Sequence, residues 1–130
     1  MLDHITFGVA RFERALAFYD QALAPLGITQ LYAEGPDFAG YGVAPKAFFW
    51  IGQKPTPITG TPITGTHVAF TAETRVMVDA FYQAAIAAGG TCNGPPGPRP
   101  HYHSDYYGAF VLDPDGHNIE AVCHQPAPVI

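Results

Sequence analysis

Charge is scarce in this chain, and positive charge is the scarcer kind. Charged residues make up 13% of the 130 residues, about half their share in an average soluble protein. The 6 Lys and Arg residues stand against 11 Asp and Glu residues. No run of basic residues is present that could neutralise the phosphates of a nucleic acid or bind an anionic bilayer surface. We therefore expect neither nucleic acid nor a membrane among its partners.

Long hydrophobic runs and cysteines are also missing. No segment approaches the roughly 18 uninterrupted apolar residues of a membrane-spanning helix. The first nine residues carry Asp3 and His4 inside an apolar stretch and do not resemble a secretory signal. The two cysteines, Cys92 and Cys123, are too few for a disulfide framework or a cysteine-based zinc site. These absences favour a cytoplasmic protein with buried free thiols.

What the chain does contain is an internal repeat. At an offset of 63 residues the sequence aligns with itself without a gap from His4 to Gly27. The identical pairs are His4 and His67, Phe7 and Phe70, Ala17 and Ala80, Phe18 and Phe81, Tyr19 and Tyr82, Ala22 and Ala85, Ala24 and Ala87, and Gly27 and Gly90. Identity in one continuous register indicates the duplication of half a domain.

Each copy shows the same order of predicted elements. Apolar residues recur at three- and four-residue steps over 12–26 and 78–88, which predicts a helix in each copy. Short β-branched and aromatic runs predict strands at 2–9, 28–33, 41–43, 47–51, 66–71, 107–112 and 117–124. Asp-Pro-Asp-Gly at 113–116 predicts the turn of a hairpin. Residues 93–104 hold four prolines and are predicted to form a stiff loop.

These elements predict an α+β protein built from two tandem βαβββ modules in a single domain. We place the first module at 1–52 and the second at 66–124, with a tail at 125–130. Residues 53–65, which include a repeated Thr-Pro-Ile-Thr-Gly sequence, form the predicted linker.

Three potential metal ligands lie on predicted strands. Residues two apart share a face of a strand, so His4 and His67 have small or hydroxyl-bearing neighbours that leave space for a cavity. Glu120 falls in an otherwise apolar strand, where a carboxylate needs a metal or another cation. Two imidazoles and one carboxylate are ligands of zinc and of Fe(II). The alternative is that both histidines are satisfied core residues and Glu120 is a surface charge on an edge strand.

A family resemblance follows from these segments. His4-Ile-Thr-Phe-Gly-Val, Ala15-Leu-Ala-Phe-Tyr-Asp and Leu26-Gly27 resemble the first module of the vicinal oxygen chelate superfamily, which includes glyoxalases, bleomycin resistance proteins and extradiol dioxygenases. His67-Val-Ala-Phe and Phe110-Val-Leu-Asp-Pro-Asp-Gly-His-Asn-Ile-Glu120 resemble its second module. The resemblance implies that the two modules form an incomplete barrel around a central site with a divalent metal. It also implies a homodimer.

Carried over by position, the resemblance implies that His4, His67 and Glu120 hold the metal, which would be Zn, Ni, Mn or Fe. Glyoxalase I has another glutamate in the last strand of its first module, where Trp50 is the best match here. This departure argues against glyoxalase I chemistry and leaves a three-ligand set similar to that of dioxygenases and fosfomycin resistance enzymes. We expect Trp50 to line an apolar part of the substrate pocket.

The polar, aromatic segment 99–107 is a candidate wall of the same pocket. We expect His101, His103 or Tyr106 to transfer a proton as the catalytic group, with the two histidines on one side of an extended loop. Arg99 and Tyr107 are predicted to bind substrate, Arg99 by clamping a carboxylate or phosphate. The alternative is a surface loop that only covers the sheet.

The sequence therefore favours a small metal-dependent enzyme of lyase, isomerase or oxygenase type that acts on a small oxygen-chelating substrate. A metal-free protein of the bleomycin-resistance kind, which sequesters a small ligand, remains the alternative because the fourth ligand is missing. A third possibility is a module whose site is a relic.

Overall fold

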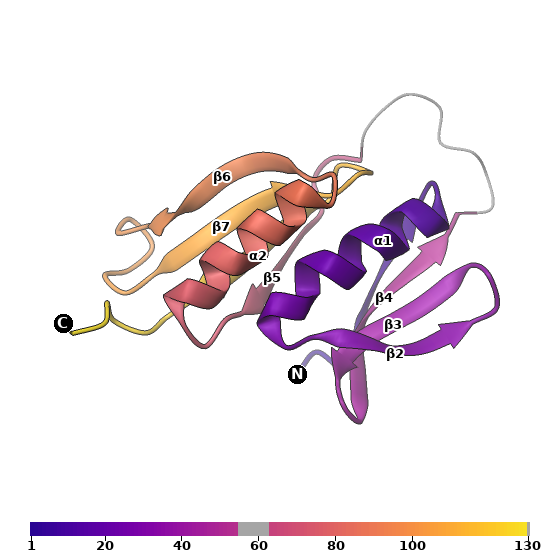
Figure 1. Cartoon of the computed structure of the whole chain (residues 1–130), viewed down its shortest axis with the longest axis horizontal. Coiled ribbons are helices and arrows are strands. Elements are labelled where there is room, and N and C mark those ends of the chain that lie inside the picture. Colours follow the sequence, from indigo (N-terminus) through magenta and orange to yellow (C-terminus); the bar gives the residue numbers. More distant parts are fainter. Residues whose placement is uncertain (55–62, 130) are drawn as a thin grey trace.

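The computed structural model describes residues 1–54 and 63–129 (Figure 1). The first module contains β1 (Ile5–Val9), α1 (Phe12–Leu23), the short 3₁₀ helix η1 (Ala24–Leu26), β2 (Thr29–Glu34), β3 (Phe38–Val43) and β4 (Lys46–Gln53). The second contains β5 (His67–Thr71), α2 (Arg75–Ala87), β6 (Thr91–Pro98), β7 (Tyr107–Leu112) and β8 (Asn118–Cys123). Most of the predicted linker lies outside the described residues. No described helix is long and apolar enough to cross a membrane.

Each module forms its own four-stranded mixed sheet. The strand orders are β1-β4-β3-β2 and β5-β8-β7-β6, and in each sheet the first strand pairs in parallel with the last. The remaining pairs are antiparallel. The prediction of an α+β fold with two tandem βαβββ modules is confirmed, and neither described sheet closes into a barrel.

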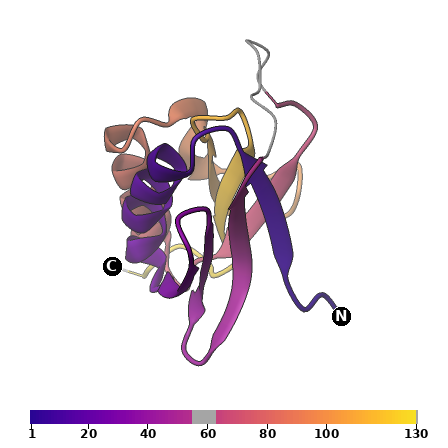
Figure 2. The same cartoon turned by 90° about the vertical axis from the view of Figure 1, so that its right-hand side faces the viewer.

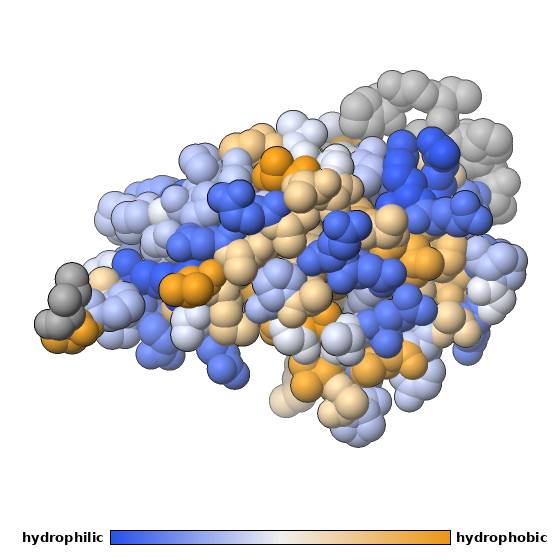
Figure 3. Space-filling view, in the orientation of Figure 1, coloured by the Kyte–Doolittle hydropathy of each residue, from blue (hydrophilic) through white to orange (hydrophobic). Residues whose placement is uncertain are grey.

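The core lies between the helices and one face of both sheets. Figure 2 shows both helices on the same side of the strands. Alternate strand residues point towards the helices and are buried, among them Phe7 and Ile51 in the first sheet and Phe70 and Ile119 in the second. The other side of the helices carries many hydrophilic residues (Figure 3). This alternation leaves the opposite face of each sheet for other roles.

Residues 91–98 correct the prediction of a loop from 93 to 104. The segment Thr91–Pro98 forms β6, an edge strand of the second sheet, and its pairing with β7 shifts register twice. Pro95, Pro96 and Pro98 have no N–H to donate, and an edge strand with bulges is the place in a sheet that tolerates this loss. Only the part that follows Pro98 is a turn.

The turn between β7 and β8 joins the two modules. Asp115 Oδ1 accepts a hydrogen bond from the Ala10 backbone N–H at 2.9 Å and one from Arg14 Nη2 at 3.2 Å. The buried His117 ring stacks on Phe7, with ring centroids 4.3 Å apart, and its Nε2 lies 2.9 Å from the Gly8 carbonyl oxygen. These contacts fix the first strand and helix against the end of the second module.

A buried carboxylate holds this turn. Asp113 Oδ1 accepts from the backbone N–H groups of Asp115 and His117, and its Oδ2 accepts from the Tyr19 hydroxyl at 2.5 Å. Burial raises the pKa of Asp113, and the Tyr19 hydrogen bond acts in the opposite direction. Burial also raises the pKa of Tyr19, which therefore remains a donor.

We predict that Tyr19→Phe lowers the free energy of unfolding at neutral pH by about 1–3 kcal/mol, because Asp113 loses the one side-chain donor that the described residues give it. Because burial raises the native pKa of Asp113, its ionised form destabilises the folded state at pH values above that pKa. Tyr19→Phe removes a hydrogen bond that lowers this pKa, so the destabilisation increases. The difference from wild type should shrink as the pH falls and Asp113 becomes protonated. Urea unfolding at neutral and mildly acidic pH measures both effects. The control is Tyr82→Phe, the half-buried repeat equivalent, and an equal loss in both variants would contradict the prediction.

Candidate functional site

The faces of the two sheets that point away from the helices, here called the open faces, carry the candidate functional residues. In the second sheet His67 pairs with Asn118, and Ala69 pairs with Glu120. Phe110 lies opposite Glu120 on the neighbouring strand β7. Cross-strand partners project to the same side of a sheet. The parallel register of β5 and β8 therefore brings His67 and Glu120 together on one open face.

Glu120 lies at the centre of this open face and is only 2% exposed. Its Oε1 lies 2.9 Å from His67 Nε2, and its Oε2 accepts a hydrogen bond from the Tyr106 hydroxyl. A Cβ on Gly108 would lie 3.2 Å from Oε2, so glycine leaves room for the carboxylate. In the described part of the chain no lysine or arginine forms an ion pair with Glu120. The carboxylate is thus desolvated and compensated by an imidazole and a phenol.

The hydrogen bonds of His67 define where its proton lies. Asn118 Nδ2 is 2.7 Å from His67 Nδ1, and an amide nitrogen can only donate. His67 Nδ1 is therefore the acceptor, and in the neutral ring the proton is on Nε2, which donates to Glu120. The His67 side chain remains 43% exposed, so the pair is reachable from solvent.

Tyr106 is the one predicted proton-transfer residue that contacts Glu120. Burial, and next the hydrogen bond to Glu120, raise the pKa of Tyr106 well above its ordinary value. The phenol therefore keeps its proton at neutral pH and acts as a donor. It stands at the end of the turn that follows β6, immediately before β7.

The histidines were predicted to share a side of an extended loop, but the chain turns between Arg99 and Tyr106, so the segment is not extended. His103 Nδ1 accepts from the Asp105 backbone N–H at 3.0 Å, so its Nε2–H donates to His124 Nδ1 at 2.6 Å. Both rings pack against the Tyr106 ring. His101 instead packs on Tyr102.

Arg99 and Phe110 extend the open face of the second sheet. The Arg99 guanidinium lies over the Phe110 ring at 5.5 Å, and the Phe110 and His67 rings are 6.0 Å apart. Arg99 donates to the backbone carbonyls of Gly97, Pro98 and Pro95. Because these carbonyls use several of its N–H groups, Arg99 holds the irregular strand β6 in place, and its positive charge lies against the Phe110 ring.

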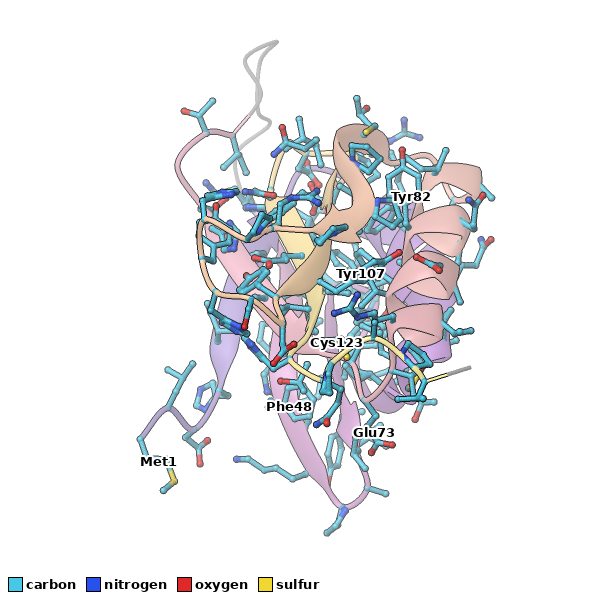
Figure 4. The ribbon with its side chains drawn as sticks, turned by 90° about the vertical axis from the view of Figure 1, so that its left-hand side faces the viewer. Met1, Phe48, Glu73, Tyr82, Tyr107 and Cys123 are labelled. Atoms are coloured by element: carbon cyan, nitrogen blue, oxygen red, sulfur yellow. The ribbon has the colours of Figure 1, made fainter. Side chains whose placement is uncertain are left out.

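Tyr107 lies away from the open face. Its hydroxyl donates to Asp79 Oδ1 of α2 at 2.7 Å, and the Arg75 guanidinium lies 5.0 Å from its ring centroid. Figure 4 shows Tyr107 between the strands and α2. Adjacent strand residues point to opposite sides, and Tyr107 falls on the helix side. The structure thus places this predicted substrate-binding residue outside the site.

His4 is separate from His67 and Glu120 in one chain. It precedes β1 on the open face of the first sheet, where its Nδ1 lies 2.7 Å from Asp3 Oδ1. Lys46 Nζ donates to the same oxygen at 2.7 Å, and Lys46 and His4 lower the pKa of Asp3. The ionised Asp3 can only accept, so in the neutral His4 ring the proton is on Nδ1, and Nε2 carries a lone pair with no hydrogen-bond partner among the described residues.

Trp50 takes the place in the first sheet that Glu120 takes in the second. Thr6 pairs with Trp50, and Ala69, which is 63 residues after Thr6, pairs with Glu120. The indole lies against Gly40, where an added Cβ would come within 2.7 Å of the ring. It packs between the rings of Tyr32 and Phe38. Trp50 and Phe38 line a hollow of about 400 Å³ together with His4, Thr6 and Lys46.

Part of the predicted donor set suits a divalent metal. His67 and Glu120 converge as an imidazole and a carboxylate on a solvent-reachable face, which suits such an ion. Within residues 1–54 and 63–129 of one chain, however, no group of three or more His, Cys, Asp or Glu residues could hold a metal. Among the described residues of one chain, His67 and Glu120 come together, and His4, the third predicted ligand, does not join them.

Residue-level prediction missed the partners of both histidines. Asp3 is adjacent to His4 in sequence, and Asn118 stands two residues before Glu120 on the same face of a strand. That spacing was the available signal for Asn118. The contacts of Tyr32 and Phe38 with Trp50 depend on the register of β2, β3 and β4, which no local motif specifies.

Solved structures of similar proteins share this architecture. A glyoxalase/bleomycin resistance protein from Albidiferax ferrireducens T118 is 35% identical, with a TM-score of 0.82 over 95% of this chain and 98% of that chain. A glyoxalase/bleomycin resistance protein/dioxygenase family enzyme from Burkholderia phytofirmans PsJN is 21% identical, with a TM-score of 0.72 over 95% and 98% of the two chains. The second likeness concerns the fold alone.

A third similar structure carries a metal. It is a mutant of the fosfomycin resistance protein FosX from Listeria monocytogenes, solved with Mn(II) and 1S,2S-dihydroxypropylphosphonic acid. It is 21% identical, with a TM-score of 0.66 over 93% of this chain and 87% of that chain, and is likewise similar in fold. The family model described as glyoxalase/bleomycin resistance protein/dioxygenase superfamily matches residues 1–121. With a match of that extent over two βαβββ modules, the chain belongs to the glyoxalase/bleomycin resistance protein/dioxygenase superfamily.

Proposed function

We propose that this protein is a metal-dependent enzyme of lyase, isomerase or oxygenase type that acts on a small substrate with chelating oxygens. The observation that carries the proposal is the buried Glu120 carboxylate, which faces His67 Nε2 and has no lysine or arginine partner in the described chain. A divalent cation is the charge that such a carboxylate lacks. Zn, Ni, Mn and Fe all accept imidazole and carboxylate ligands.

A second copy of the chain supplies His4 in this proposal. His4 is exposed, and its Nε2 is free to bind a metal. β1 and β5 are edge strands of their sheets, which leaves backbone groups for a neighbour. An apolar groove of about 510 Å³ runs beside them and includes Ile5, Phe48 and Val68. Leu2 at its rim is 78% exposed. A homodimer with two-fold symmetry would use both edges and build two equal sites.

The chain's own residues have distinct roles in such a site. His67 and Glu120 hold the ion, which supplies Lewis-acid polarisation of substrate oxygens. Tyr106 orients the Glu120 carboxylate through its hydrogen bond. Trp50 provides an apolar wall that excludes water, and Arg99 adds positive charge for an anionic substrate. Among the candidates for proton transfer, His103 contacts the ring of Tyr106, and His101 is exposed at the rim of the turn.

Glu120→Gln is expected to reduce the bound metal at least tenfold while the fold is retained, because the amide has nearly the same shape but no charge. Elemental analysis of protein purified without a chelating tag measures the metal, and circular dichroism checks the fold. Glu73→Gln, the same change at an exposed glutamate, is the matched control. Full metal occupancy in Glu120→Gln would remove this residue from the ligand set.

Mixing two defective variants tests whether the site is shared between copies. His4→Ala and His67→Ala should each lose metal when alone. After joint unfolding and refolding, half of the dimers are mixed, and each mixed dimer holds one intact site out of two. We therefore expect about a quarter of the wild-type occupancy to return. If the mixture binds no more metal than the separate variants, or if wild type elutes as a 13.9 kDa monomer in gel filtration, the shared site is excluded.

A metal-free ligand-binding protein of the bleomycin-resistance kind is the second candidate. Trp50 favours this candidate. It occupies the position in the first sheet that is equivalent to that of Glu120 in the second, and it packs with Tyr32 and Phe38 to form an aromatic surface.

Because Trp50 is the only tryptophan, its fluorescence reports binding directly. Metal-free bleomycin added in the presence of a chelator should leave the emission unchanged if the protein is the proposed enzyme. Saturable quenching that Trp50→Phe loses, with an affinity independent of the chelator, would instead establish the binding protein. Free N-acetyltryptophanamide serves as the control for non-specific quenching.

A further inference from the structure

Asn118 is the backbone-register partner of His67 and its closest polar neighbour on β8. His67 pairs with Asn118 across β5 and β8, and Asn118 Nδ2 donates to His67 Nδ1 at 2.7 Å. This bond keeps Nδ1 unprotonated, so the proton of the neutral ring lies on Nε2 and is donated to Glu120. In this arrangement the ring nitrogen that faces Glu120 has no free lone pair.

A histidine binds a metal through an unprotonated nitrogen, and its other nitrogen usually donates its proton to an acceptor. For His67 to bind through Nε2, the proton must be on Nδ1 and an oxygen must face it. The Asn118 side chain contains that oxygen: Oδ1 is buried and has no hydrogen-bond partner within residues 1–54 and 63–129. A half-turn of the amide exchanges Nδ2 and Oδ1 with little change in shape.

The two predicted histidine ligands differ in this respect. His4 has a carboxylate as its partner, and Asp3 can only accept from Nδ1. The position of the first sheet that corresponds to Asn118 is Phe48, which has no polar group. His4 is therefore fixed in the metal-binding tautomer, whereas the partner of His67 can serve either tautomer. This asymmetry arises from residues that diverged between the two copies of the module.

We propose that Asn118 is a positioning residue that switches His67 between two tautomers by rotation of its amide. Without metal, Asn118 Nδ2 donates to Nδ1, and Nε2–H satisfies the buried Glu120. With metal, Asn118 Oδ1 accepts from Nδ1–H, and the Nε2 lone pair joins Glu120 as a ligand. Water takes the proton from Nε2 and returns one to Nδ1, so His67 releases no net proton. The inference rests on the proposed metal site.

The switch explains how Glu120 is compensated in both states. A buried carboxylate left without a partner is costly, and the Nε2–H tautomer avoids that cost before the ion arrives. When the ion replaces the Nε2 proton of His67, the new Nδ1–H would face the Nδ2–H of Asn118. Rotation of the Asn118 amide turns Oδ1 towards Nδ1–H and removes this conflict. The same side chain therefore supports the empty and the loaded site.

The test follows the ring nitrogens of His67 by long-range ¹H–¹⁵N correlation, assigned with His67→Ala. Metal-free wild type should show His67 protonated on Nε2. Saturation with Zn²⁺ should move the proton to Nδ1. Both spectra use the wild-type protein and therefore do not depend on whether a variant at position 118 folds. A proton on Nδ1 of His67 in the metal-free protein would overturn the switch.

Asn118→Leu retains the size of the side chain and removes both polar ends. We expect a mixture of His67 tautomers without metal and a Zn²⁺ affinity about 10- to 100-fold weaker by calorimetry. Asn93→Leu is the matched control, because Asn93 is exposed nearby in the hollow that includes His67 and Asn118. Equal Zn²⁺ affinity in wild type and Asn118→Leu would overturn the inference while the metal site stands. If wild type binds no Zn²⁺, Ni²⁺, Mn²⁺ or Fe²⁺, the proposed function fails, and the switch fails with it.

Discussion

The burial of one carboxylate governs the arrangement of the second module. Glu120 is almost fully covered and can retain its charge only if donors or a cation surround it. The parallel register of β5 and β8 brings His67 to one oxygen, and the turn after β6 brings Tyr106 to the other. Gly108 keeps the space open on the neighbouring strand. Together these features give the buried carboxylate two donors and the space that it needs.

The same backbone plan in the first module supports different chemistry. The pairing of β1 with β4 repeats that of β5 with β8, yet Trp50 occupies the position of Glu120. An indole needs no charge compensation, and it lies against Gly40 among other aromatic rings. His4 has kept its place but is served by Asp3, its neighbour in sequence. Duplication thus provided two equivalent open faces. After divergence the first carries the apolar Trp50 and the second carries the charged Glu120.

Sequence reasoning predicted both helices and most strands, because both copies of the repeat keep the periodic apolar positions of these elements. It matched Trp50 to Glu120 through the family resemblance, and the register of the two sheets places these residues at equivalent positions. Sequence reasoning did not predict β6, because a proline-rich sequence is typical of a loop, and only the pairing with β7 shows that it forms a bulged edge strand. The sequence predicted Tyr106 and Tyr107 in the same pocket, but their side chains diverge. The Tyr106 hydroxyl contacts Glu120 from the turn, whereas Tyr107 is the first residue of β7 and its hydroxyl contacts Asp79 of α2.

Charge links the two open faces in the proposed shared site. In that site two neutral imidazoles and one carboxylate would leave a divalent ion with a net positive charge, and the Arg99 guanidinium lies over Phe110, the aromatic neighbour of His67. A second glutamate at position 50 would have cancelled the charge of the ion. Trp50 instead leaves that charge uncompensated next to an apolar wall, where electrostatic attraction is less screened. Such a site favours a substrate that brings its own negative oxygens and an apolar part. The replacement of one carboxylate by an indole therefore bears on substrate choice more than on the capacity to hold the ion.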